Sequence, residues 1–108
     1  MSGRDGNTHQ IQVVIHHYME ALRLQPTFVE AHHNLGVTLA DQGRVAEAIE
    51  HYTEALRFRP RYVNAHYNLG LALAKQGRVA EARQHFAEVL RLDPTHSAAR
   101  QLLQSSGQ

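Results

Sequence analysis

The chain repeats itself after 34 residues, and this repetition limits its fold more than any other feature. Residues Val29–Tyr62 align with Val63–His96 without a gap, and about 20 of the 34 aligned positions are identical. Separate folding units do not agree to that degree by accident in a chain of 108 residues. Short periods of this kind are typical of solenoids, in which each repeat packs on its neighbours. The repeat is therefore the unit from which the fold is built.

Each copy of the repeat is predicted to form two helices joined at a Gln-Gly-Arg turn. The glycines of the two turns, Gly43 and Gly77, can adopt the left-handed conformation that ends a helix. Apolar residues on both sides of the turn recur at helical spacing, as Ala31, Leu35 and Leu39 do in the first copy. Because such a hairpin cannot bury its apolar face alone, successive copies are expected to stack.

The flanks of the two full copies continue the same pattern. The segment before the first copy aligns with the second helix of the repeat, and a helix is expected to begin near Thr8. The segment after the second copy aligns with the first helix and is polar, as a terminal cap should be. The predicted boundaries are 1–9 for a flexible N-terminus, 10–104 for a single domain (10–28 half repeat, 29–62 repeat, 63–96 repeat, 97–104 capping helix) and 105–108 for a flexible tail.

The residues that recur in register resemble the tetratricopeptide repeat, whose motif includes Leu-Gly, Ala, an aromatic residue and a closing Pro. The matching positions are Leu35, Gly36, Ala48, Tyr52, Ala55 and Pro60 in the first copy and Leu69, Gly70, Ala82, Phe86, Val89 and Pro94 in the second. Two positions depart, since His32 and His66 replace the opening Trp of the family, and Leu39 and Leu73 replace its Tyr. The resemblance implies an all-α, right-handed helical-repeat solenoid of about six antiparallel helices.

Composition excludes several classes of function. The formal net charge of +1 is too small to favour binding to nucleic acid or to an acidic membrane. The chain has no cysteine, and hence no disulfide or thiol chemistry. No apolar run approaches the length of a membrane span, so a cytoplasmic protein is expected. No phosphate-binding loop or catalytic set is present, and we predict a protein without enzymatic activity, catalytic residues or cofactor.

Nine histidines raise the question of a metal site, but repetition explains most of them. His17, His51 and His85 are one repeat position seen three times, and His32 and His66 are another seen twice. Side chains 34 residues apart lie on successive parallel helices and form a ladder instead of converging on one ion. We therefore predict no metal, and we expect His32 and His66 to fill the Trp position of the family with smaller, hydrogen-bonded rings.

The resemblance also implies a function, the binding of an extended peptide or a partner helix in a concave groove lined by the first helix of each repeat. On this chain the groove residues are Glu30, His33, Asn34, Val37, Asp41, Asn64, Tyr67, Asn68, Leu71 and Lys75. Asn34 and Asn68 share one repeat position, and a row of amides can bind a peptide backbone or bond a neighbouring helix. The row is similar in style to the superhelical repeats of O-linked N-acetylglucosamine transferase. It lacks the basic residues with which chaperone-tail adaptors hold a terminal carboxylate.

A second hypothesis is structural self-assembly into a homo-oligomer through the N-terminal half repeat. Ile15, Met19 and Leu22 form an apolar stripe on a helix that has no first-helix partner. Exposed side chains of this size each forfeit roughly 1.5–3 kcal/mol, which favours their burial against another chain or upstream repeats. Folding of residues 1–9 over the stripe is the alternative. An enzyme is expected only if the chain is a piece of a longer transferase, and RNA binding is disfavoured by a groove without a basic lining.

Overall fold

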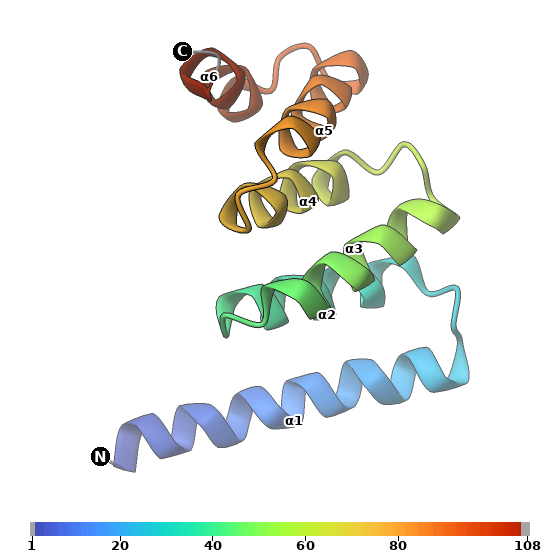
Figure 1. Ribbon diagram of the computed structural model, residues 1–108. Coiled ribbons are helices and arrows are strands. Elements are labelled where there is room, and N and C mark those ends of the chain that lie inside the picture. The colour runs from blue at the N-terminus through green and yellow to red at the C-terminus, as the bar shows by residue number, and fades with distance from the viewer. Residues whose placement is uncertain (1, 107–108) are drawn as a thin grey trace.

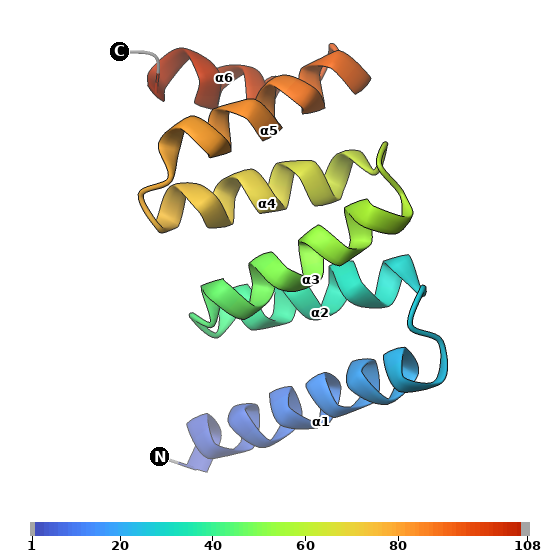
Figure 2. The same ribbon diagram turned by 45° about the vertical axis from the view of Figure 1, so that its right-hand side comes forward.

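The computed structural model describes residues 2–106, with the side chains of residues 8–105, and in this part of the chain six α-helices stack along one axis (Figures 1 and 2). The helices are α1 (Ser2–Leu24), α2 (Val29–Asp41), α3 (Val45–Phe58), α4 (Val63–Lys75), α5 (Val79–Leu92) and α6 (Ser97–Ser106). α2 packs with α3 and α4 with α5, while α1 and α6 lie at opposite ends of the stack. The predicted all-α helical-repeat fold with six helices is confirmed.

The helices of the two full repeats end where the pattern predicts. α2 and α4 end at Asp41 and Lys75, and the glycines of the following turns have positive φ angles, 79° at Gly43 and 78° at Gly77. These left-handed residues confirm the predicted helix ends. At the C-terminus α6 continues past residue 104 to Ser106. Of the predicted tail 105–108, residues 107–108 lie outside the described residues.

α1 is longer than predicted. It begins at Ser2, whereas the sequence pattern placed its start near Thr8. Extending an existing helix avoids the cost of nucleation, so a helix held by packing near its C-terminal half can propagate into a polar segment. Met1 lies outside the described residues, and the flexibility of the remaining residues of segment 1–9 stays a prediction.

Each hairpin is held by an aromatic side chain of its second helix set against a glycine of its first. Tyr52 is 2% exposed, and a Cβ on Gly36 would lie 2.6 Å from its ring carbon Cε1. Phe86 is also 2% exposed, and a Cβ on Gly70 would lie 2.5 Å from its Cε1. Non-bonded carbons normally approach to about 3.5–4 Å, so neither glycine leaves room for a side chain. This close approach offsets the roughly 1 kcal/mol that glycine costs inside a helix.

His32 and His66 are buried, hydrogen-bonded rings, as predicted for the position that holds Trp in the family. The Nε2 atom of His32 lies 2.8 Å from the carbonyl oxygen of Pro26, and its Nδ1 lies 3.2 Å from the Nδ1 of His51. His66 makes the corresponding two contacts 34 residues later, at 2.8 and 3.1 Å. Each ring thus joins the two helices of its hairpin to the loop that precedes them.

The outer surface of the second helices carries ion pairs between residues three apart. Three pairs occupy equivalent repeat positions: Glu20–Arg23, Glu54–Arg57 and Glu88–Arg91. Two further pairs begin these helices, Arg44–Glu47 at 2.7 Å and Arg78–Glu81 at 2.8 Å. Exposed pairs of this kind contribute about 1 kcal/mol or less each, so packing between helices holds the fold. None of the described helices is both long enough and apolar enough to cross a membrane.

Candidate functional site

A hollow of about 190 Å³, termed the first hollow, lies on the face where α2 and α4 are neighbours. It is lined by residues of α2, α3 and α4. Five of the lining residues belong to the groove predicted from the sequence: Val37, Asp41, Asn68, Leu71 and Lys75. Side chains from both copies of the repeat therefore meet in one cavity.

Polar groups line the wall and rim of the first hollow. The buried Tyr52 ring forms part of this wall. Burial, and after it the charge of Asp41, raise the pKa of Tyr52 to about 12, so the hydroxyl keeps its proton at neutral pH. Asp41 and Lys75 are exposed and contribute one negative and one positive group. The hollow thus offers hydrogen-bond donors and acceptors without a net charge.

Asn68 lies between the first hollow and the core. Its amide nitrogen is 2.9 Å from the Nε2 of His33 on α2, so the amide donates a hydrogen bond from one repeat to the other. His33 is 8% exposed, and its ring centroid lies 5.8 Å from that of Tyr52 and 5.1 Å from that of Tyr62. Burial lowers the pKa of His33. His33 therefore contributes to packing between the repeats. Its hydrogen bond uses the amide nitrogen of Asn68 and leaves the amide oxygen of Asn68 available for another donor.

A second hollow of about 210 Å³ lies one repeat further along, between α4, α5 and α6. Its lining includes six residues that stand 34 positions after lining residues of the first hollow: Leu71, Ala74, Val79, Phe86, Leu102 and Ser105. Where the first hollow has Tyr52 and Asn68, the second has Phe86 and Leu102. The two hollows are therefore the same site repeated, with polar groups in the first replaced by apolar ones in the second.

The other predicted groove residues lie outside the two hollows. Glu30 is at the opposite end of α2 from the first hollow, and its carboxylate lies 3.1 Å from the guanidinium of Arg59. Asn34 and Asn64 are exposed on α2 and α4. Tyr67 is half-buried, and its ring lies against that of Phe86 in α5, at 6.0 Å between centroids. The structure therefore brings together only the C-terminal half of the predicted groove.

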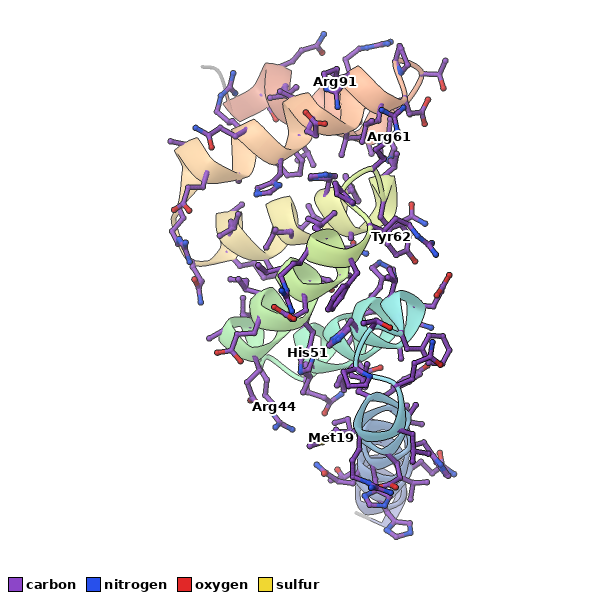
Figure 3. All side chains as sticks on the ribbon, turned by 90° about the vertical axis from the view of Figure 1, so that its right-hand side faces the viewer. Met19, Arg44, His51, Arg61, Tyr62 and Arg91 are labelled. Atoms are coloured by element: carbon purple, nitrogen blue, oxygen red, sulfur yellow. The ribbon has the colours of Figure 1, made fainter. Side chains whose placement is uncertain are left out.

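The residues of the predicted self-association stripe differ in exposure. Ile15 is 5% exposed and belongs to the core, and Leu22 is half-buried against the same core. Met19 is 58% exposed, and it lies on the same side of the molecule as Arg44, away from Tyr62 (Figure 3). Of the three residues, only Met19 is free to contact another molecule.

A different face of α1 is uncovered, because among the described residues no helix packs on it in the way that α2 packs on α3 and α4 packs on α5. Val14 is 40% exposed, whereas Ala48, its equivalent one repeat later, is fully buried. Tyr18 is likewise half-buried where Tyr52 is 2% exposed. This face was not predicted, although the repeat alignment identifies it: its positions on α1 are the equivalents of positions that are buried within the complete hairpins.

Two pairs of histidines also escaped the sequence analysis. His32 meets His51 inside the first hairpin and His66 meets His85 inside the second, with ring centroids 5.4 and 5.3 Å apart. Burial, and after it the partner ring, lower the pKa values of His51 and His85. The repeated spacing of 19 residues was the available signal. Among the described residues no three His, Asp or Glu side chains gather where they can hold a metal ion.

Three repeat families match the chain. One, described as TPR repeat, matches residues 38–77, and two described as tetratricopeptide repeat match residues 17–50 and 63–96. Together these matches run from residue 17 to residue 96. The comparison with curated proteins gave no match.

Solved structures with the same architecture include three tetratricopeptide repeat proteins. MamA, known from a crystal structure, is 25% identical to this chain in sequence and superposes with a TM-score of 0.76. The match covers 82% of this chain and 52% of the MamA chain. YrrB, described as a TPR protein with an unusual peptide-binding site, is 22% identical in sequence with a TM-score of 0.78. The match covers 88% of this chain and 49% of the YrrB chain. The Arabidopsis OM64 TPR domain is 20% identical in sequence with a TM-score of 0.84. The match covers 95% of this chain and 85% of the OM64 domain.

This chain thus spans about half the length of MamA and of YrrB and most of the OM64 domain. The matches establish the repeat and its fold. They do not point to O-linked N-acetylglucosamine transferase in particular, so that finer resemblance stays a prediction.

Proposed function

This chain belongs to the tetratricopeptide repeat family, and we propose that it is a non-enzymatic module that binds an extended peptide of a partner protein along the face that carries the two hollows. Modules of this family typically mediate protein–protein interactions and are in general not catalytic. YrrB, which has the same fold, is described as having a peptide-binding site, and this supplies a precedent for such a site on the architecture.

One observation carries the proposal, namely that residues of two successive repeats line a single hollow. Asp41 and Lys75 stand at equivalent repeat positions and carry opposite charges, so the rim suits the alternating N–H and C=O groups of a peptide backbone. Val37 and Leu71 are half-buried and supply apolar contact on the same face. The exposed amide of Asn34 extends this polar row along α2. A peptide can therefore gain both hydrogen bonds and apolar burial here.

A cross-linking experiment tests this site because Lys75 is the sole lysine of the chain. An amine-directed photo-cross-linker attached to Lys75 is expected to capture members of a random decapeptide library at low micromolar to millimolar concentration, the affinity range expected of short peptides on a shallow surface. Replacing both groove amides, Asn34→Ala/Asn68→Ala, is expected to lower the yield severalfold. Peptide yield is measured by mass spectrometry of the cross-linked protein.

The matched control moves the lysine and keeps the composition. In the variant Lys75→Arg/Arg57→Lys the sole lysine lies on the exposed surface of α3, where Arg57 is 65% exposed. The N-terminal amine is common to both proteins and sets the background. Equal capture from the two positions would contradict binding at the groove.

The second candidate function is self-association through α1, favoured by the exposure of Val14 and Met19. If these residues form an interface, the variant Val14→Glu/Met19→Glu is expected to reduce the dimer fraction at high protein concentration, measured by sedimentation. Thr53→Glu places the same charge at the repeat position equivalent to Met19 on α3 and is the control. A wild-type protein that stays monomeric at high concentration would exclude this function.

A further inference from the structure

We propose that the two hollows bind two side chains of one peptide, an amide side chain in the first hollow and an aliphatic side chain in the second, three residues apart. This inference rests on the proposed function, because it needs a peptide on this face. It adds the chemical class of the peptide. The proposal follows from the lining of each hollow and from their separation.

The first hollow suits a neutral amide better than a charged or apolar side chain. Its hydrogen-bond donors are the Tyr52 hydroxyl and the Lys75 ammonium. Its acceptors are the Asn68 amide oxygen and the Asp41 carboxylate. Glutamine and asparagine carry a donor and an acceptor in one planar group, so they can satisfy both kinds. A charged side chain would be attracted by one of the two rim charges and repelled by the other, and it offers either donors or acceptors but not both. An aliphatic one would cover Tyr52 and Asn68 and leave them without partners.

The second hollow suits an aliphatic side chain. Phe86 and Leu102 replace the two polar residues, and Val79 is 46% exposed at its edge. The polar groups at this hollow are already bonded to the backbone of α6. The Arg83 guanidinium donates to the carbonyl oxygen of Leu103 at 2.8 Å, and the Ser105 hydroxyl donates to that of Gln101 at 3.0 Å. Burying an aliphatic side chain here removes apolar surface from water and leaves no buried polar group without a hydrogen bond.

The separation of the hollows sets the spacing in the peptide. The first lies between α2 and α4 and the second between α4 and α6, so they lie on either side of α4. A helix with its side chains is about 10–12 Å wide. A peptide in the polyproline II conformation rises about 3.1 Å per residue with three residues per turn, so side chains three residues apart share a face at about 9 Å. Pairs on one face of a β-strand, two residues apart, lie about 7 Å apart and fit less well.

Synthetic decapeptides with a serine and alanine background test the pattern. Titration by fluorescence anisotropy is expected to give about tenfold tighter binding for Gln-x-x-Leu than for Leu-x-x-Leu or Glu-x-x-Leu. Peptides with the pattern Gln-x-Leu or Gln-x-x-x-Leu are expected to bind as weakly as the single-residue controls. The same ranking must appear in chemical-shift changes at the side-chain amide of Asn68.

The repeat supplies its own exchange variant. The triple variant Tyr52→Phe/Asn68→Leu/His33→Tyr gives these three positions the residues that the chain already has 34 positions later, although the neighbouring Tyr62 corresponds there to His96. Its preference is expected to change to Leu-x-x-Leu. The single variant Tyr52→Phe, which removes one oxygen atom, is expected to lose part of the preference for glutamine while keeping the helix content.

The outcomes separate this inference from the proposed function. If peptides bind and cross-link at Lys75 but all patterns bind equally, or if the triple variant keeps the preference for glutamine, the two-hollow proposal is wrong and groove binding stands. If no peptide of any pattern binds or cross-links there, the proposed function fails, and this inference fails with it.

Discussion

Lowering the pH from about 7.5 to about 5 is expected to reduce the free energy of unfolding, through three histidines that resist protonation in the fold. The pKa values of His33, His51 and His85 are all lowered, and burial is the largest cause for each. Such a group takes up a proton on unfolding. Stability is therefore full above the ordinary pKa of 6.5 and is lost as the pH falls below it, by about 1.4 kcal/mol per pH unit for each proton.

The hydrogen bonds identify the nitrogen at which His51 takes up a proton. The Nε2 of His32 faces the carbonyl oxygen of Pro26 and must carry a hydrogen, so the Nδ1 of a neutral His32 accepts a hydrogen bond from the Nδ1 of His51. The first proton therefore adds to the free Nε2 of His51. The carboxylates of Glu47, Glu50 and Glu54 favour the first proton and reduce the effect, but do not cancel it.

Urea unfolding followed by circular dichroism at several pH values measures this dependence. In the variant His51→Gln/His85→Gln an amide can still donate to the partner ring but cannot titrate, so the loss of stability between about pH 6.5 and pH 5 should shrink to the part due to His33. His17→Gln is the matched control, because His17 shares the repeat position and is exposed on α1. A pH dependence unchanged by the double variant would show that the pairs are not its source.

Most of the fold could be predicted from the sequence because its determinants are local and occur twice. Gly43 and Gly77 mark the helix ends through their own conformational freedom, and each is followed by a second helix as expected. Gly36 and Gly70 predicted close helix approach because glycine within a helix needs compensation. These inferences depend on a residue and its near neighbours, which a sequence displays directly.

The parts of the site that escaped prediction depend on contacts between helices. His51 was assigned to a ladder along the solenoid, yet its ring turns inward to His32, a contact set by the rotation of α3 against α2. Asn68 was paired with Asn34 by repeat position, but Asn68 is half-buried and donates to His33 of the preceding first helix, whereas Asn34 is exposed. Ile15 was judged exposed because a first helix precedes it in other copies, whereas the helix that follows covers it. Residues at equivalent repeat positions therefore differ in burial and in bonding partners, because the helices that pack against them differ.

The substitution with the largest expected effect is Tyr52→Ala, which should lower the free energy of unfolding by about 3–5 kcal/mol. The ring of Tyr52 is 2% exposed, fills the space that Gly36 leaves open, and packs against His33. Removing it leaves a cavity that the two helices cannot close, since their backbones already meet around the glycine. Neighbouring repeats stabilise one another, so the loss should be felt by the whole stack and not by one hairpin. Urea unfolding at neutral pH measures it.

Tyr18→Ala is the matched control, because Tyr18 occupies the same repeat position on α1 without a first helix to pack on. Its ring is only half-buried, and its removal leaves no enclosed cavity, so a loss of about 1 kcal/mol is expected from the smaller area returned to water. The comparison separates the contribution of the aromatic residue from that of the hairpin around it. Equal losses of unfolding free energy for the two substitutions would mean that α1 is covered in solution as fully as α3. That result would indicate a partner bound to the open face of α1.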